Sequence, residues 1–513
     1  MATGTIDAAL APQAAQPIGK SSMNAAQVVT PPAAELVLTI ITVMMYMVSL
    51  SYGGLVATIC NYVGPALLGV AVLWAVFVFV RRDINTIWTP LVWIRLAIAA
   101  YFGIGAIVPF LTNDQTSDLI RAFFNFYEID VIKYNLVNSV FVLLFSLFST
   151  ITLGTLRSTN FRRYFNIAEP KFTTSAIRQE VFGGILIFIG LTTNILIVYP
   201  IQFGWISGNI PQAASSLSQL SLVGYFLCIN WAVRTKSNFQ YLVLALCAFE
   251  SFMGAAQLSK FATIFPWVMA AMGFFYTQIT WKRMAAFGFG IGLLYFAVAP
   301  VLAFSREYIA NQYGTEYSAP FGERLNAMQS YYSGAGKISD DDVQLGWARL
   351  SYVNAGSWAI SQYDHGLPGD SWRYMFIVWI PRVIYPGKPI ITDVSREFTF
   401  MVNGNFDSST SPGLPAEGYW VLGWIGVAIC AMILNLIFVF WSLYSIAVLR
   451  SRAWHLFFIV LMGMRTGLRI DGSMVADVIG PIGIAVIAHI VLELANRHFP
   501  TRISTVLNSV GAS

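Results

Sequence analysis

The chain has 513 residues, of which 57% are hydrophobic and only 11% are charged, and its formal net charge is +5. Soluble domains carry roughly 25% charged residues, so a soluble globular fold of this size is excluded. In such an apolar chain the basic excess mostly reflects membrane topology, and it does not imply a nucleic-acid partner. The four cysteines fall in or beside apolar runs without a CxxC pair, so neither a zinc site nor a disulfide framework is indicated.

The apolar residues come in runs of about 20, which are long enough to cross about 30 Å of hydrocarbon as helices. These runs predict an all-α, polytopic integral membrane protein with about twelve transmembrane helices. The predicted spans lie near residues 36–56, 62–80, 90–111, 135–156, 181–201, 217–235, 239–257, 261–279, 284–304, 418–440, 454–470 and 478–495.

The runs divide the chain into five parts. Residues 1–34 are rich in Ala, Pro, Gln and Ser and are predicted to be a disordered cytoplasmic tail, not a signal peptide. A bundle of about nine transmembrane helices over residues 35–304 is followed by a long loop over residues 305–417. Three more transmembrane helices over residues 418–495 and a cytoplasmic tail over residues 496–513 complete the chain.

The basic residues sort to one side of these spans. Every second connection is rich in them, and together these connections hold Arg81, Arg82, Arg157, Arg162, Arg163, Lys171, Arg178, Arg234, Lys236, Lys282, Arg283, Arg450, Arg452 and Arg497. The positive-inside rule then predicts that both termini are cytoplasmic and that the long loop lies on the opposite side. That loop holds 12 of the 25 acidic residues. Because long loops of distinct composition are commonly functional, we expect it to be the active region.

Fixed cations follow a short apolar stretch in this loop. Residues 375–380 are apolar but too few to span, so they are expected to form an interfacial or re-entrant helix. The following sequence, PRVIYPGKP from Pro381 to Pro389, places Arg382 and Lys388 where they could bind a diphosphate. The alternative is that both side chains simply reach toward the membrane interface. Arg396 adds a third cation, although Glu397 could pair with it.

A carboxylate and two arginines follow at the ends of late spans. Glu417 begins the tenth span and is expected where membrane meets water, where partial loss of water would raise its pKa and allow it to act as general base for a sugar hydroxyl. The alternative is a carboxylate that favours a helix N-terminus. Arg465 and Arg469 are four residues apart and therefore share one helix face. Charges in such a place are usually functional, unless they pair internally with Asp471 or Asp477.

Other titratable residues have less defined roles. His365, the one histidine in the loop, is a second candidate base. Glu250 and Arg95 fall within spans, where they could pair with each other or line a path for lipid. The loop has no HExxH, P-loop or GxSxG motif, and its acidic run Asp340–Asp342 is typical of a solvated turn, so no metal and no cofactor is expected.

The arrangement resembles the Wzy-type repeat-unit polymerases of O-antigen, capsule and exopolysaccharide assembly. That family combines many spans and one late periplasmic loop with a PRxxxPxKP element followed by a Thr/Ser-Pro-Gly stretch. A late Arg-Gly element of the family is matched loosely by Arg465 and Gly467. The residues that match the two loop elements are Pro381, Arg382, Pro386, Lys388, Pro389, Thr410, Pro412, Gly413, Glu417, Tyr419, Gly423 and Gly426.

The resemblance implies a glycosyltransferase in the bacterial inner membrane, with a fold similar to the membrane-embedded glycosyltransferases of the C class (GT-C) and an active site that faces the periplasm. Its substrate would be an oligosaccharide on undecaprenyl diphosphate, transferred without metal or nucleotide sugar. A chain-length regulator and a flippase of the same pathway would be its partners in the lipid bilayer. An O-antigen ligase of similar fold and a polysaccharide flippase remain as alternatives.

Overall fold

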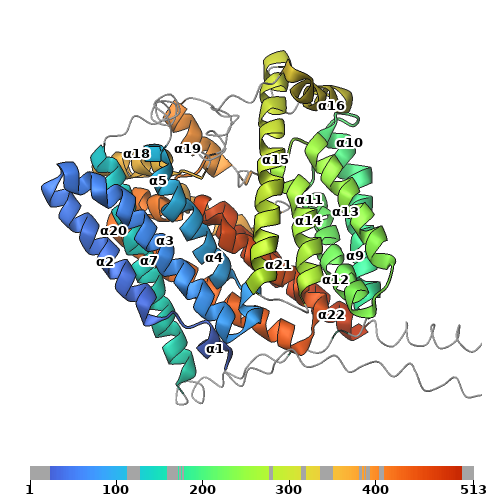
Figure 1. Ribbon diagram of the computed structural model, residues 1–513, viewed down its shortest axis with the longest axis horizontal. Coiled ribbons are helices and arrows are strands. Elements are labelled where there is room, and N and C mark those ends of the chain that lie inside the picture. Colours follow the sequence, from blue (N-terminus) through green and yellow to red (C-terminus); the bar gives the residue numbers. More distant parts are fainter. Residues whose placement is uncertain are drawn as a thin grey trace, which may run out of the picture.

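The computed structural model describes residues 24–111, 128–158, 172, 175, 178–208, 210–276, 281–313, 319–335, 350–380, 384–385, 387–388, 393–403 and 410–498. Every regular element in these ranges is a helix (Figure 1). Ten helical segments are long and apolar enough to cross a membrane, so the predicted class, a polytopic α-helical membrane protein, is confirmed. Each of the twelve predicted ranges overlaps a helix. The two that fall short of a full span are α14 (Lys260–Phe275) and α21 (Phe457–Leu468).

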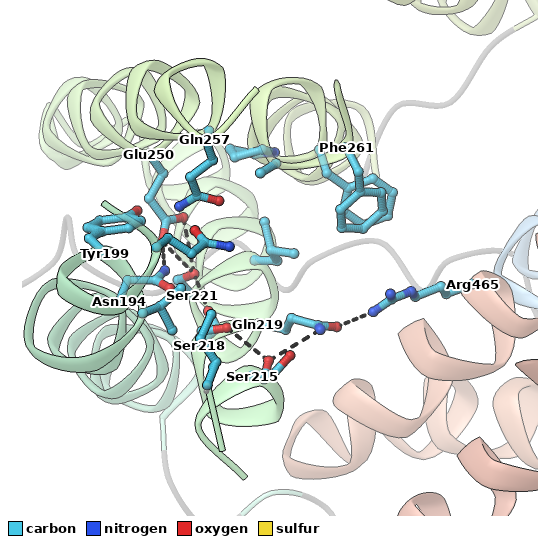
Figure 2. A pocket seen from close by; sticks show the side chains of 18 residues that line it. Asn194, Tyr199, Ser215, Ser218, Gln219, Ser221, Glu250, Gln257, Phe261 and Arg465 are labelled. Atoms are coloured by element: carbon cyan, nitrogen blue, oxygen red, sulfur yellow. Dashed lines mark hydrogen bonds between the residues drawn. The ribbon is translucent and has the colours of Figure 1, made fainter. Parts of the chain in front are cut away.

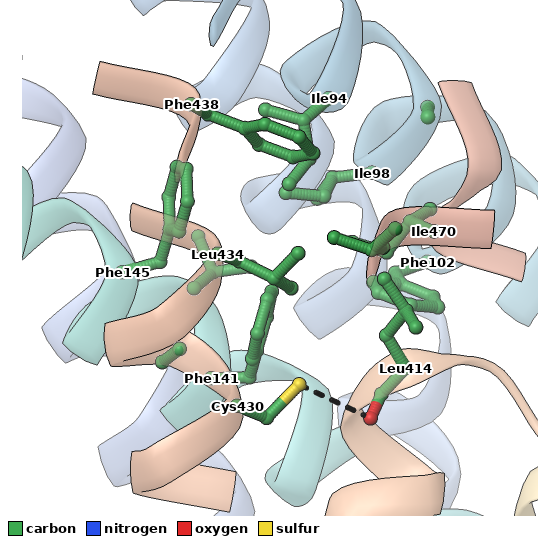
Figure 3. Packing of buried hydrophobic residues seen from close by; sticks show 14 of the residues in the cluster. Ile94, Ile98, Phe102, Phe141, Phe145, Leu414, Cys430, Leu434, Phe438 and Ile470 are labelled. Carbon is green, nitrogen blue, oxygen red and sulfur yellow. Dashed lines mark hydrogen bonds between the residues drawn. The ribbon is translucent and has the colours of Figure 1, made fainter. Parts of the chain in front are cut away.

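The helices form two packed groups. The first group consists of α2 (Ala33–Tyr52), α3 (Gly54–Arg82), α4 (Pro90–Ile98), α7 (Glu128–Arg157) and α20 (Leu414–Ser451) (Figure 1). The π-helix η2 (Ala99–Ile104) and α5 (Gly105–Leu111) continue α4. The aromatic and aliphatic side chains between these helices form one buried core, part of which is drawn in Figure 3.

The second group lies on the other side of α21. It contains α9 (Gln179–Thr193) with the π-helix η3 (Asn194–Val198), α12 (Leu220–Thr235), α13 (Phe239–Ala256), α14 and α15 (Trp281–Tyr313) (Figure 1). Helix α21 contacts both groups, because it packs on α4 and α20 of the first and on α12 of the second. The last helix, α22 (Gly480–His498), packs on α21.

A buried ion pair holds three helices of the first group together. Arg95 on α4 donates from Nε and Nη2 to the two carboxylate oxygens of Glu35 on α2, at 3.0 and 3.3 Å. Ser146 on α7 donates to the same carboxylate at 2.7 Å. Arg95 therefore pairs with Glu35 and not with Glu250, which was one of the two alternatives that the sequence left open. Arg95 is fully buried, and a charge without a partner there would cost several kcal/mol, on the order of 3–5.

One end of the molecule, which we call the arginine end, carries the short helix α1 (Ala25–Val28) (Figure 1). Arg82 donates to the carbonyl of Thr30 at 2.7 Å, and Arg157 donates to the carbonyl of Ala26 at 3.1 Å. Arg450 pairs with Asp83 at 2.9 Å at the same end. Residues 24–34 therefore differ from the predicted disordered tail: Ala26, Val28 and Val29 are buried, and the arginines bind the backbone carbonyls between helices.

The opposite end, which we call the loop end, carries the described parts of the predicted loop. They are α16 (Phe321–Ser330), the π-helix η4 (Tyr331–Ala335), α18 (Val353–Asp364), the 3₁₀ turns η5 (Ser371–Tyr374) and η6 (Ile377–Trp379), and α19 (Asp393–Asn403). Helix α15 runs to Tyr313, nine residues beyond the predicted boundary. The short helices α10 (Tyr199–Gln202) and α11 (Gln212–Ser218) lie at this end too (Figure 1).

The apolar residues 375–380 do not form the predicted interfacial helix. Only Ile377–Trp379 form a 3₁₀ turn, η6, and Ile380 is extended with φ −73° and ψ 121°. The residue before a proline disfavours the α conformation, and Pro381 follows in the sequence. Phe376 remains 80% exposed, so the stretch presents an apolar surface without being a helix.

Helix α20 folds back on itself near its start. Leu422 and Gly423 leave the helical conformation, and Gly423 has φ +59°, which glycine adopts without strain. The Sγ of Cys430 consequently lies 3.4 Å from the carbonyl oxygen of Leu414 (Figure 3). In a straight helix these residues would be about 24 Å apart. Residues 414–421, which we call the fold-back arm, therefore lie against the following span.

We expect the two ends to face opposite sides of the membrane, since the arginines of the connections gather at one of them. The four cysteines are buried, so a membrane-impermeant thiol reagent should label the parent protein weakly. Leu367→Cys, at a loop-end position that is 61% exposed, should react in intact cells. Lys236→Cys, exposed after α12, should react only after permeabilisation. Equal labelling of both variants in intact cells would contradict this topology.

The fold-back should depend on the close approach of two glycines. A Cβ at Gly426 would lie 1.9 Å from the carbonyl oxygen of Gly418, and backbone atoms cannot move away cheaply. Gly426→Ala should therefore lower the half-denaturation temperature in detergent, at a cost of about 1–3 kcal/mol for overpacking. Gly290→Ala on α15 is the matched control, because nothing lies within 4 Å of its added Cβ. Equal denaturation temperatures for the two variants would contradict the fold-back.

Candidate functional site

Glu417 on the fold-back arm connects three parts of the loop end. Its Oε1 accepts a hydrogen bond from the Ser371 hydroxyl at 2.7 Å, and its Oε2 accepts one from the backbone N–H of Met474 at 2.7 Å. Ser371 begins η5, and Met474 begins the π-helix η9 (Met474–Ile479). The first N–H groups of a helix lack internal partners, so a carboxylate stabilises this helix start.

Glu417 is not at the water interface where the sequence suggested. It is only 1% exposed, because the fold-back carries it against the core. In the described residues its two hydrogen bonds come from one loop residue and one residue of the turn after α21. A buried carboxylate that accepts two hydrogen bonds fixes both segments relative to α20.

Arg469 lies in the turn that Glu417 holds. This turn includes the 3₁₀ helix η8 (Arg469–Asp471), and Arg469 donates from Nε to Asp477 Oδ1 at 2.9 Å. Asp477 Oδ2 also accepts from the N–H of Ser473 at 3.0 Å. The internal ion pair that the sequence left open for Arg469 is therefore present. The side chain of Arg469 is still 48% exposed, so the turn after α21 presents a cation at the loop end.

A buried aspartate and tyrosine lie behind this turn. The hydroxyl of Tyr352 donates to Asp471 Oδ2 at 3.0 Å. Burial raises the pKa of Asp471 above its usual range, although the nearby Arg469 acts in the opposite direction. Burial and the adjacent Asp471 also raise the pKa of Tyr352 well above its usual value. Asp471 thereby ties α18, which begins beside Tyr352, to the turn that carries Arg469.

Arg465 lies four residues before Arg469, and both side chains are exposed. It donates to the side-chain oxygen of Gln219, and its guanidinium carbon lies 5.1 Å from the ring centre of Phe261. The described residues give it no ion pair with Asp471 or Asp477. Arg465 therefore faces the second helix group, while Arg469 faces the turn held by Glu417.

A second polar group, which sequence reasoning missed, surrounds Asp364. Lys133 forms an ion pair with one oxygen of Asp364, and the hydroxyl of Tyr419 donates to the other at 3.0 Å. The ammonium of Lys133 also lies 5.1 Å from the centre of the Tyr419 ring. Because Lys133 and Asp364 are 231 residues apart, no sequence spacing indicates their contact.

His365 follows Asp364 directly and is exposed. Its Nδ1 lies 2.7 Å from the carbonyl oxygen of Ser361, which can only accept, so Nδ1 carries a proton. The neutral ring then has its lone pair on Nε2. Asp364 and Tyr352 lie at opposite ends of α18, about 18 Å apart for a helix of this length. The structure thus connects Glu417 to the segment after α21 that also carries Arg469, whereas His365 lies at the end of α18 remote from Tyr352 and Asp471.

The remaining predicted cations are placed only in part. Arg382, Pro381 and Pro389 lie outside the described residues. Lys388 donates to the carbonyls of Val378 and Ile380, and Arg396 is half-buried on α19. The suggested pairing of Glu397 with Arg396 is wrong.

Glu397 instead accepts from Arg373 Nη2 at 3.2 Å. The other matched positions support the backbone of the site. Thr410 donates its N–H to Thr399 Oγ1 at 2.8 Å, Tyr419 binds Asp364, and Gly423 forms the fold-back.

Comparison of the chain with models of known protein families, with curated proteins and with solved structures found no match. The site is therefore interpreted from its own residues and from the resemblance noted above.

Glu417 should contribute to stability through its two hydrogen bonds. Glu417→Ala leaves the buried Ser371 hydroxyl and Met474 N–H without acceptors, at about 1–3 kcal/mol each. Glu417→Gln should stay close to wild type, because its amide oxygen can accept from Met474 and its amino group can donate to the Ser371 oxygen. Half-denaturation temperatures in detergent measure the difference. A Gln variant as unstable as the Ala variant would show that the negative charge itself is required.

Proposed function

We propose that this chain is a membrane glycosyltransferase that polymerises lipid-linked oligosaccharide repeat units at the periplasmic side of the bacterial inner membrane. The growing glycan passes from undecaprenyl diphosphate to the terminal sugar of the next lipid-linked unit. The observation that carries the proposal is the double hydrogen bond of Glu417. These bonds join the long loop to the turn that carries Arg469. The family resemblance points to both regions.

Each residue has a defined part in the proposed reaction. The acceptor hydroxyl oxygen forms a bond to the anomeric carbon of the donor sugar, and the bond from that carbon to the diphosphate oxygen breaks. The leaving undecaprenyl diphosphate takes the bonding electrons, and the half-exposed Arg469 stabilises its charge. The hydroxyl proton passes to Ser371, which gives its own proton to Glu417 Oε1, since the carboxylate itself is buried.

The electrostatics at the loop end suit this reaction. Arg469 is held by Asp477 in one orientation, so a diphosphate meets a fixed donor instead of a flexible chain. Glu417 is buried, so water does not compete with the Ser371 hydroxyl for hydrogen bonds to the carboxylate. Arg382, in the matched PRxxxPxKP element, is the further cation that the resemblance assigns to the diphosphate.

Deletion of the gene separates this proposal from its alternatives. Loss of a polymerase should leave single repeat units attached to the final acceptor, whereas loss of a ligase should leave long polymer on the lipid carrier. Loss of a flippase should leave single lipid-linked units on the cytoplasmic side. Extracted glycans resolved by length and by lipid attachment distinguish these outcomes, and either of the latter two would reject polymerisation.

Complementation of the deletion strain tests the residues. Arg469→Ala should reduce polymer formation by roughly a hundredfold to a thousandfold, the usual cost of one donor to a developing anion. Glu417→Gln should express normally and form no polymer, because an amide takes no proton.

Arg373→Ala is the matched control for Arg469. Arg373 is also ion-paired at the loop end and also 48% exposed, and exposed pairs contribute little. Equal polymer from the Arg469 and Arg373 variants would remove Arg469 from the mechanism. Wild-type polymer from Glu417→Gln would transfer the proton-accepting role to another group, with His365 as the next candidate.

A further inference from the structure

A polar cavity of about 200 Å³ lies inside the loop end of the second helix group (Figure 2). Its wall is built from η3, α10, α11, α12, α13 and α14. Much of the lining consists of amide, hydroxyl and carboxylate side chains, including Asn194, Gln202, Ser218, Ser221, Glu250 and Gln257. Polar groups inside a membrane bundle are costly, so their collection around one space indicates a ligand site.

Glu250 provides a fixed acceptor in the wall. The side chain is 5% exposed, and its Oε1 accepts from Asn194 Nδ2 at 2.7 Å and from Ser221 Oγ at 3.0 Å. Asn194 begins the π-helix η3 (Asn194–Val198), a rare distortion that is frequent at functional sites. Figure 2 shows Gln257 beside Glu250 in the same wall.

The side chain of Gln202 has a hydrogen-bond acceptor, Oε1, to which no described residue donates. Its Oε1 is buried and receives no hydrogen bond from the described residues, while its backbone carbonyl accepts from Arg324 at 3.0 Å. A buried acceptor without a partner is unfavourable by about the value of the hydrogen bond it lacks. A ligand hydroxyl in the cavity would satisfy it once the Gln202 side chain turns toward the cavity.

The other side of the cavity is aromatic. Phe261 and Phe265 on α14 stack with ring centres 4.3 Å apart, and both line the cavity. Arg465 reaches from α21 to this edge, where it contacts Phe261 and Gln219 (Figure 2). The cavity thus has an apolar face and a hydrogen-bonding wall. A sugar ring matches both, because its C–H face can pack on the aromatic side and its hydroxyl groups can bond to the polar wall.

We propose that this cavity binds one sugar ring of the lipid-linked glycan. This assignment rests on the proposed function for the identity of the glycan. It extends that function by placing a sugar subsite in the second helix group. Arg465, on α21 at the cavity edge, and Arg469, in η8 directly after α21, are four residues apart. One substrate can therefore place its diphosphate at Arg469 and a sugar beyond Arg465.

Two lipids test the subsite. One is the single repeat unit on undecaprenyl diphosphate, extracted from the deletion strain, and the other is undecaprenyl diphosphate alone. Binding to the purified full-length protein is measured by native mass spectrometry. The double variant Gln202→Met, Gln257→Met should bind the glycosylated lipid roughly tenfold more weakly, the loss expected for two ordinary hydrogen bonds, and should bind undecaprenyl diphosphate as wild type does.

Gln240→Met is the matched control. Gln240 lies near the start of α13, whereas Gln257 directly follows the end of that helix, and Gln240 does not line the cavity. Gln202→Met alone keeps the test valid if the double variant is unstable, because no described hydrogen bond to Oε1 is lost. Equal binding of the glycosylated lipid by these variants and wild type would overturn the sugar subsite. Equal weakening for both lipids would overturn it too, because the cavity would then hold the diphosphate.

Arg469→Ala distinguishes this failure from failure of the proposed function. That variant should weaken the binding of both lipids, because both carry the diphosphate. If Arg469→Ala binds both lipids normally, the proposed diphosphate site fails, whatever the glutamine variants show.

Discussion

The fold-back of α20 is the constraint on which the loop end depends. At 38 residues this helix would measure about 57 Å if it were straight, almost twice the hydrocarbon thickness. The conformation of Gly423 turns the first residues back, and the contact between Gly418 and Gly426 lets the two segments approach closely. The excess length is thereby converted into a short arm that carries Glu417 and Tyr419 into the structure.

The arm organises its surroundings through polar contacts that would be weak at a water-exposed surface. Glu417 holds η5 and η9, while Tyr419 holds Asp364 at the end of α18. Both contacts lie between segments that are distant in sequence, so they fix the loop on the bundle. The arginine end uses a different device, in which arginines bind backbone carbonyls near α1. Carboxylates therefore accept the connecting hydrogen bonds at the loop end, whereas arginines donate them at the arginine end.

Hydrophobic run length was enough to predict the helices, because a span must be apolar over about 20 residues whatever it packs against. The shared helix face predicted for Arg465 and Arg469 did not form, because α21 ends at Leu468 and Arg469 belongs to the following 3₁₀ turn. The partners of charged residues did not follow from the sequence either. Arg95 binds Glu35, 60 residues away, and Lys133 binds Asp364, 231 residues away. Which carboxylate an arginine meets depends on how helices pack, and a single sequence carries no periodic signal for that.

The burial of Glu417 is a second property that a single sequence does not predict. The sequence placed it correctly at the start of a span, but its exposure depends on the backbone conformation at Gly423, six residues later. A glycine in a span is compatible with close helix packing as well as with a left-handed turn, and only the second brings Glu417 inside. The contact of the carboxylate with the segment after α21 is therefore a consequence of one backbone reversal. Arg465 on α21 and Arg469 in η8 directly after it then point toward two different polar regions, so the end of α21 divides the loop end into a charged part and a part lined by amides.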